Sequence, residues 1–221
     1  MNEMNAVKAY KGVGMEGIIA SWYARNTRRE SRHREMAERM AALIPAGSRV
    51  LEIAPGPGYF SIELARLGNY QITGLDISQS FVKMAQENAA RAGVDIDFRQ
   101  GNAADMPFAD ETFNFSICQS AFKNFSQPVQ ALKEMHRVLL PGGQAVIIDL
   151  RSDATLDEIE RYIASMNTSA INRLVTRWTF KNMLLKNAYT IAEVESFVAQ
   201  TPFRDCRVEK DEISFTLWLQ K

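Results

Sequence analysis

Between Arg49 and Leu150, short apolar segments alternate with longer amphipathic ones. The segments "RVLEIA", "YQITGLD", "VDIDF", "TFNFSIC" and "QAVIIDL" have the length and apolar content of buried strands. Strands that alternate with helices in this way run parallel, are joined by right-handed crossovers and are covered on both faces. The chain therefore predicts an α/β fold with a doubly wound sheet.

Local signals mark the ends of the intervening helices. Gly68 is expected as a left-handed residue that closes a helix over Tyr59–Leu67, and Ser78 as the N-cap of a helix that runs through Ala92. Pro128 stands in the first turn of the helix "VQALKEMHRVL", where a missing N–H costs little. The following "PGG" is expected to end that helix before the fifth strand begins.

The alternation of strands and helices stops after the fifth strand. Residues 152–189 are expected to form a helical insertion, a lid with an apolar face or ordinary core packing. The next helix opens with a capping box, Thr190 with Glu193, and two strands close the chain. Because only a polar turn separates these two strands, they must be antiparallel. The domain prediction is a helical cap over 1–45, followed by the α/β domain over 46–221. Six residues of the insertion supply the expected apolar face: Met166, Leu174, Trp178, Phe180, Met183 and Leu184.

The loop "APGPG" after the first strand has more glycine than a tight turn needs. Gly56 and Gly58 let a ligand approach the backbone, and the next helix offers unpaired N–H groups. In a doubly wound sheet this loop lies at the ligand-binding edge. Glu52, just before the loop, repels a pyrophosphate but suits an ammonium group. Asp76, at the end of the second strand, is placed to accept the hydroxyls of a ribose. A ligand with a ribose at one end and an amino acid at the other fits both, and S-adenosyl-L-methionine has those parts.

Five motifs in series resemble the class I S-adenosylmethionine-dependent methyltransferases, in their small-molecule (methyltransferase type 11) branch. They are "VLEIAPGPG", "GLDIS", "GNAADMPF", "FNFSIC" and "LKEMHRVLLPGG". The resemblance covers about residues 48 to 150, and the tail more loosely. It implies a Rossmann-like seven-stranded sheet, mostly parallel with an antiparallel C-terminal strand, plus N-terminal helices and a helical insertion before the last strands. It also implies S-adenosyl-L-methionine as cofactor and S-adenosyl-L-homocysteine as product.

The resemblance assigns cofactor contacts to particular residues. Around the methionine moiety it places Glu52, Ala54, Gly56 and Gly58, and at the ribose Asp76. It puts Ile77 against the adenine face, Asn102 and Ala103 at the adenine edge with Met106 nearby, and Gln119 and Ser120 near the sulfonium. Relatives usually carry Asp where this chain has Asn102, whose amide oxygen can still accept a hydrogen bond from the adenine amine. Altered affinity rather than lost binding is expected.

The resemblance names no catalytic residue. A sulfonium methyl is already activated, so transfer chiefly needs an aligned nucleophile, and a general base helps only when the nucleophile starts protonated. Tyr23 or His33 is expected to orient the substrate or the cofactor carboxylate, and Lys123 or Arg151 to bind an anionic substrate. The exposed candidates in the variable parts of the chain are Tyr10, Trp22, Tyr23, His33, Lys123, Asn124 and Arg151.

Composition narrows the function classes. Zero net charge over 221 residues argues against a nucleic-acid or polybasic membrane partner. No stretch has the length and apolar content of a membrane span or a signal core, which favours a cytoplasmic protein. Cys118 and Cys206 are expected as reduced, buried thiols, and no Cys/His cluster has the spacing of a metal site. A monomer and a homodimer both remain open.

Two other functions remain open. One is an S-adenosylmethionine-binding protein without catalysis. The other is an NAD(P)-dependent reductase, which would want a third glycine where Ser61 stands and a Tyr-x-x-x-Lys-type pair, and the sequence has neither.

Overall fold

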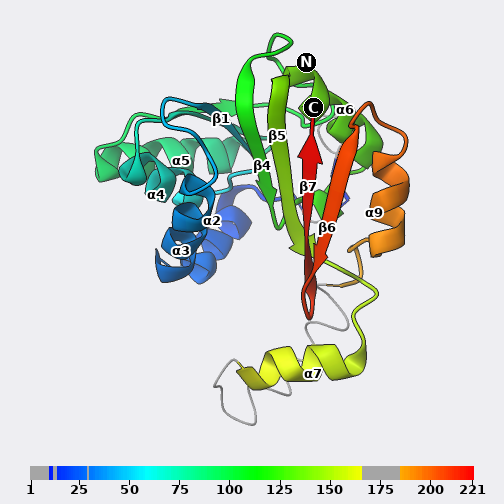
Figure 1. The fold of residues 1–221 in the computed structure, drawn as a ribbon. Coiled ribbons are helices and arrows are strands. Elements are labelled where there is room, and N and C mark those ends of the chain that lie inside the picture. Colours follow the sequence, from blue (N-terminus) through cyan, green and yellow to red (C-terminus); the bar gives the residue numbers. More distant parts are fainter. Residues whose placement is uncertain (1–9, 12–13, 29, 166–184) are drawn as a thin grey trace.

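The computed structural model describes residues 10–11, 14–28, 30–165 and 185–221. It contains a seven-stranded sheet of order β3-β2-β1-β4-β5-β7-β6, in which β7 is antiparallel to both of its neighbours. The predicted doubly wound, mostly parallel sheet with an antiparallel last strand is confirmed (Figure 1). The strands are β1 (Arg49–Ile53), β2 (Gln71–Asp76), β3 (Asp97–Gln100), β4 (Phe113–Gln119), β5 (Leu139–Leu150), β6 (Asp205–Lys210) and β7 (Ser214–Gln220).

Helices cover the sheet in two layers (Figure 1). On one side lie α2 (Gly17–Thr27), α3 (Glu30–Ala41), α4 (Tyr59–Leu67) and α5 (Gln79–Ala92), and on the other α6 (Pro128–Val138) and α9 (Ile191–Val198). Each layer buries its own apolar cluster against the strands, one including Val50 and Phe60, the other Leu51 and Leu132. A short 3-10 turn, η1 (Phe122–Asn124), follows β4, and α7 (Leu156–Ser165) stands apart from both layers (Figure 1).

Several helix ends lie where the sequence places them. The Ser78 hydroxyl accepts a hydrogen bond from the Phe81 N–H at the start of α5, and Gly93 closes that helix in the left-handed region with φ 69°. At α9 the Thr190–Glu193 capping box is complete in both directions. These helix ends are set by hydrogen bonds between residues three positions apart, so short sequence patterns are enough to predict them.

Three local predictions are wrong. Gly68 is extended with φ −172°, not left-handed; a Cβ there would lie 2.8 Å from the Tyr70 ring, so close approach explains the glycine. The third strand begins at Asp97, not at Val94. The helix α6 ends at Val138 rather than at "PGG", because β5 already begins at Leu139. Leu139 pairs with Phe113 and Gln144 with Phe115, so the glycines lie in an irregularity inside β5.

The N-terminal helices share the core of the main domain. Met40 and Ile44 join the apolar cluster that contains Val50 and Phe60, and both are buried. The 1–45 cap therefore packs directly on the sheet layer, while its boundary as a domain stays a prediction. Of the predicted 152–189 lid, the structure describes residues 152–165, which include α7, and residues 185–189; the six residues of its expected apolar face lie outside the described residues.

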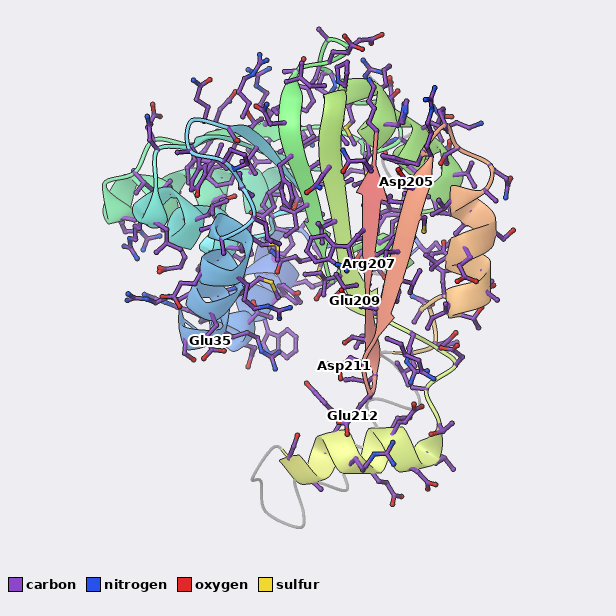
Figure 2. All side chains as sticks on the ribbon, in the orientation of Figure 1. Glu35, Asp205, Arg207, Glu209, Asp211 and Glu212 are labelled. Carbon is purple, nitrogen blue, oxygen red and sulfur yellow. The ribbon has the colours of Figure 1, made fainter. Side chains whose placement is uncertain are left out.

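The strand β6 forms an open edge of the sheet and carries charged side chains, among them Asp205, Arg207 and Glu209 (Figure 2). Charges on an edge strand discourage pairing with another sheet. Cys206 lies on this strand and is exposed, so its expected burial is wrong, whereas Cys118 in β4 is buried and both cysteines are free thiols. None of the described helices has the length and the apolar character needed to cross a membrane.

Candidate functional site

The loop after β1 holds its backbone in left-handed conformations, with Ala54 at φ 56°, Gly56 at φ 55° and Gly58 at φ 78°. A Cβ at Gly58 would also lie 2.8 Å from the Phe98 ring. Both conformation and close packing therefore require glycine at position 58. The loop reaches the start of α4 and lies, as predicted, at the carboxyl-terminal edge of the sheet.

Asp76 ends β2 and is 5% exposed. Its two carboxylate oxygens accept hydrogen bonds from the Gly56 N–H and the Ser78 N–H, each at 2.9 Å. Burial nevertheless raises the pKa of Asp76 to about 6, because the few partners do not replace lost water. This carboxylate thus ties the glycine loop to the loop after β2, at the position where a ribose is predicted.

Glu52 is 3% exposed and shares a face of β1 with Val50, the face that α4 covers. Its carboxylate accepts a hydrogen bond from the Ser61 hydroxyl in the first turns of α4. Burial raises the pKa of Glu52 to about 7, and the charge of Asp76 adds to that shift. Among the described residues neither carboxylate forms an ion pair, so two acids lie buried close together without a cation.

The adenine-side and sulfonium-side predictions fall on half-buried residues: Ile77, Asn102, Ala103 and Gln119. The Asn102 side-chain oxygen, expected to accept from adenine, accepts from the Ala104 N–H at 2.9 Å instead. The Gln119 side-chain nitrogen is buried and has no hydrogen-bond partner in the described part of the chain. That unpaired donor next to Ser120, which is exposed and left-handed with φ 56°, marks the end of β4 as polar and strained. Their contact with a ligand stays a prediction.

An N-terminal segment reaches the same edge. Tyr10 pairs with Phe125 after β4, and the Lys11 N–H donates to the Asn124 carbonyl at 2.8 Å. Burial raises the pKa of Tyr10 to about 12, with smaller contributions from Tyr23, Asp76 and Asp149. The Tyr23 ring packs edge-on against Phe81 at 5.7 Å, and its pKa is raised by burial too. Both phenols therefore lie near the buried acids and stay protonated at neutral pH.

Glu16 is a residue of this region that the sequence reading missed. Its carboxylate accepts from the Gln79 N–H at 3.0 Å and from the Ser80 N–H at 3.1 Å, and so caps α5 directly after the Asp76 loop. The Ser78 hydroxyl donates to the Met15 carbonyl. Because cap and helix are more than sixty residues apart in the sequence, no local signal could have shown this contact.

The two cations predicted to bind an anionic substrate are already paired. The Lys123 ammonium lies 2.8 Å from the Asp149 carboxylate, and both groups are largely buried. Arg151 is wholly buried, not exposed as expected. Its guanidinium donates to the Asp211 carbonyl at 3.1 Å and the Glu212 carbonyl at 2.9 Å. It also pairs with Asp153 at 3.1 Å and with Glu158 at 2.7 Å. Arg151 therefore anchors the β6–β7 turn rather than a substrate.

The other two catalytic candidates make backbone contacts. The His33 ring nitrogen lies 3.1 Å from the Thr27 carbonyl, and the ring lies 5.4 Å from that of Tyr59. Asn124 contributes its carbonyl to the Lys11 contact. Neither observation gives these side chains a chemical role, so both remain predictions.

A hollow of about 280 Å³ lies elsewhere, on the β6–β7 side of the sheet. Gln144, Arg207 and Trp218 contribute to its lining. It contains none of the predicted site residues and lies far along the sheet from β2. Within the described ranges, no group of His, Cys, Asp and Glu side chains is arranged to hold a metal ion.

Comparison with known proteins gives one family. Residues 51–147 match the family described as "Methyltransferase domain". A demethylmenaquinone methyltransferase of Deinococcus radiodurans is 36% identical over 115 residues, 52% of this chain and 48% of that protein. A ubiquinone/menaquinone biosynthesis C-methyltransferase UbiE of Bdellovibrio bacteriovorus is 34% identical over 105 residues, 47% of this chain and 45% of that protein. The matches thus span about half the length of these curated relatives.

Solved structures resemble the whole fold. A SAM-dependent methyltransferase from Aquifex aeolicus has a TM-score of 0.69 at 18% identity, over 91% of this chain and 97% of that one. A putative S-adenosyl-L-methionine-dependent methyltransferase from Methanococcus maripaludis has a TM-score of 0.72 at 19% identity, over 92% of both. The [4+2]-cyclase SpnF also matches, with a TM-score of 0.57 at 18% identity over 85% of this chain and 80% of that one. At these identities the likeness shows the shared Rossmann-like fold.

Proposed function

We propose, from the premise that residues 51–147 of this chain form a methyltransferase domain, that the protein transfers the methyl group of S-adenosyl-L-methionine to a small-molecule acceptor. The observation that carries the proposal is the pair of buried acids, Glu52 and Asp76, at the glycine loop. Burial raises the pKa of both side chains, and neither forms an ion pair among the described residues. A ligand that brings its own positive charge would offset this cost.

The residues present fit that cofactor. Glu52 and the left-handed loop at Gly56 and Gly58 suit its ammonium and carboxylate groups, and Asp76 suits its ribose hydroxyls. A dinucleotide fits less well, since Ser61 stands where its fingerprint wants a third glycine and holds the Glu52 carboxylate near the helix start. When bound, S-adenosyl-L-methionine supplies an activated methyl group.

The chain's own contribution is then to hold an acceptor in line and keep water away. Tyr10 and Tyr23 are suited to donate hydrogen bonds to an acceptor oxygen, because phenols are protonated at neutral pH and burial raises the pKa of both further. The unpaired Gln119 amide nitrogen offers another donor. Lys123 is neutralised by Asp149, so we assign it to positioning the loop after β4 rather than to binding an anion.

We take the class of methyl acceptor to test from the names of the relatives. Two of the most similar curated proteins are named demethylmenaquinone methyltransferase and ubiquinone/menaquinone biosynthesis C-methyltransferase. Because only about half of each protein is matched, demethylmenaquinone enters as the first acceptor to test among other small metabolites.

Two measurements test the proposal. Calorimetry should show binding of S-adenosyl-L-homocysteine and none of NADH; the opposite result would support the reductase instead. The purified protein, incubated with labelled S-adenosyl-L-methionine and either demethylmenaquinone or a small-metabolite extract, should transfer label to an extractable product. Binding without transfer to any acceptor would favour a cofactor-binding protein without catalysis.

A further inference from the structure

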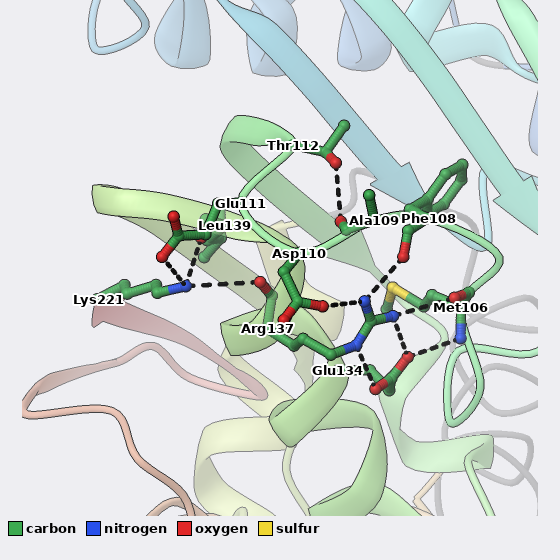
Figure 3. A network of polar contacts seen from close by, with 10 residues as sticks. All are labelled: Met106, Phe108, Ala109, Asp110, Glu111, Thr112, Glu134, Arg137, Leu139 and Lys221. Atoms are coloured by element: carbon green, nitrogen blue, oxygen red, sulfur yellow. Dashed lines mark hydrogen bonds and ion pairs between the residues drawn. The ribbon is translucent and has the colours of Figure 1, made fainter.

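A network of polar contacts joins α6 to the loop after β3 (Figure 3). We call residues 102–110 the adenine-side loop, since the predicted adenine contacts Asn102, Ala103 and Met106 belong to it. Two side chains of α6, Glu134 and Arg137, meet this loop. Their own ion pair is bidentate, with Arg137 Nε 2.8 Å from Glu134 Oε1 and Nη2 2.7 Å from Oε2. Both side chains also form hydrogen bonds with the adenine-side loop.

The network holds the loop by its backbone. Glu134 Oε2 accepts from the Met106 N–H at 2.8 Å, and Arg137 Nη2 donates to the Met106 carbonyl at 3.0 Å. Arg137 Nη1 donates to the Phe108 carbonyl at 2.7 Å and to the Asp110 carboxylate at 2.8 Å. The backbone N–H and the backbone carbonyl of Met106 are therefore both hydrogen-bonded to the same ion pair.

The surroundings make these contacts strong. Glu134 is 9% exposed and Met106 is 4% exposed, so lost hydrogen bonds there are not replaced by water. The Arg137 hydrogen bonds lower the pKa of Glu134 despite its burial, which keeps the carboxylate charged. A charged, bidentate pair that also holds three backbone groups fixes geometry in a way that an exposed helical pair does not.

The fixed part of the loop is short and continuous with Asn102 and Ala103, the residues that are predicted to contact adenine. Asn102 to Asp105 is closed by its own turn, with the Asp105 N–H bonded to the Asn102 carbonyl at 3.0 Å. The Glu134–Arg137 grip begins at the next residue, Met106. We propose that Glu134 and Arg137 are positioning residues, which hold Asn102 and Ala103 at the edge of the cofactor's adenine; the proposal rests on the function proposed above.

The test compares two nucleosides, S-adenosyl-L-homocysteine and its inosine counterpart, in which hypoxanthine replaces adenine. Wild-type protein should prefer the adenine compound, because only that compound carries the exocyclic amine. Arg137→Met should weaken binding of S-adenosyl-L-homocysteine by about tenfold and reduce the preference between the two nucleosides. Arg137→Lys and Glu134→Gln, which keep part of the network, should lose less of each.

The α4 pair Glu63 and Arg66 is a matched control. It has the same spacing and an N–O distance of 2.6 Å, but its arginine is half-exposed. Glu63→Gln and Arg66→Met should leave affinity and preference unchanged. Calorimetry is done well below each variant's midpoint of thermal unfolding, so a general loss of stability does not move the ratio of the two affinities.

The outcomes separate this inference from the proposed function. If wild-type protein binds neither nucleoside, the proposed function fails and takes the inference with it. If wild-type protein binds both equally, or if the Glu134 and Arg137 variants keep the full preference, only the positioning role is overturned. Should Arg137→Met not fold, Arg137→Lys and Glu134→Gln give the same decision.

Discussion

Two of the places where the fold buries charge differ in how that charge is paired. Arg151, at the end of β5, meets two carboxylates and two carbonyls, all supplied by the chain itself. Glu52 and Asp76 receive hydrogen bonds from a hydroxyl and two backbone N–H groups, but form no ion pair with another described residue. The first site is complete without a ligand. The second keeps an electrostatic cost that a positively charged ligand removes, which is typical of sites built for binding.

The largest expected effect on stability comes from removing Arg151, whose partners are all supplied by the chain. Arg151→Met should lower the free energy of unfolding by about 2–4 kcal/mol, because it removes the hydrogen bonds that the buried guanidinium donates to the Asp211 and Glu212 carbonyls. Denaturant unfolding measures the loss, and calorimetry on the folded fraction should show unchanged affinity for S-adenosyl-L-homocysteine. The matched control is Arg161→Met, which removes an exposed pair with Glu212 at 3.5 Å and should cost about 0.5 kcal/mol or less. Equal losses in the two variants would contradict the role given to Arg151.

The opposite sign is expected at the incomplete site. The pKa of Glu52 is raised from 4.5 to about 7 in the folded chain, so its carboxylate destabilises the fold increasingly as pH rises through that interval. Glu52→Gln keeps an oxygen for Ser61 and should raise the free energy of unfolding near pH 8 by about 1–3 kcal/mol. Near pH 4.5 the gain should vanish. The same variant should bind S-adenosyl-L-homocysteine more weakly, and a stabilised variant with full affinity would contradict the comparison.

Asp76 sharpens the comparison on the binding side. Asp76→Ala should weaken S-adenosyl-L-homocysteine binding by about 1–3 kcal/mol, because the ribose hydroxyls lose their acceptor. Asp97→Ala on the neighbouring strand removes an exposed carboxylate paired with Arg99 and serves as the control. Calorimetry of both variants at one pH decides the matter. Unchanged affinity in Asp76→Ala would refute the ribose assignment.

The smallest expected effect is a pH dependence of binding. The folded pKa values of Asp76 and Glu52 are about 6 and about 7, so both acids are partly protonated below neutral pH. A bound ammonium favours their ionised forms, so binding should release protons and tighten as pH rises from about 5 to 8. The slope should stay below about tenfold per pH unit for each proton released. Glu52→Gln should flatten it, and a wild-type affinity that weakens over this range would contradict the charge assignment.

Most of the fold could be predicted because its signals are local. The N-cap of α5 and the capping box of α9 are hydrogen bonds within one turn, and the parallel pairing of β1 to β5 follows from the alternation of strands and helices along the chain. The end of α6 was misplaced because pairing of Leu139 with Phe113, far along the chain, starts β5 early. A glycine pair that looks like a helix stop became part of a strand irregularity instead.

Part of the geometry of the candidate site could be predicted for the same reason, while its contacts with a ligand stay a prediction. The glycine loop and Asp76 carry their conformation and hydrogen bonds within one or two elements, and the structure brings them together. Arg151 was misread because its burial depends on the Asp211 and Glu212 carbonyls, some sixty residues away. Lys123 was read as free because Asp149 is not its neighbour in sequence.

Ala54 and Ser120 lie just beyond the paired ends of β1 and β4 and hold left-handed backbones without being glycine. Such a backbone costs a residue with a Cβ about 1–2 kcal/mol and costs a β-branched residue more. A library randomised at these two positions, and sorted only for folded protein, should therefore be depleted of valine, isoleucine and threonine. The same depletion is expected in cells that never make the ligand. The limited choice of amino acids at positions 54 and 120 would then be a consequence of the left-handed backbone and not of selection for activity.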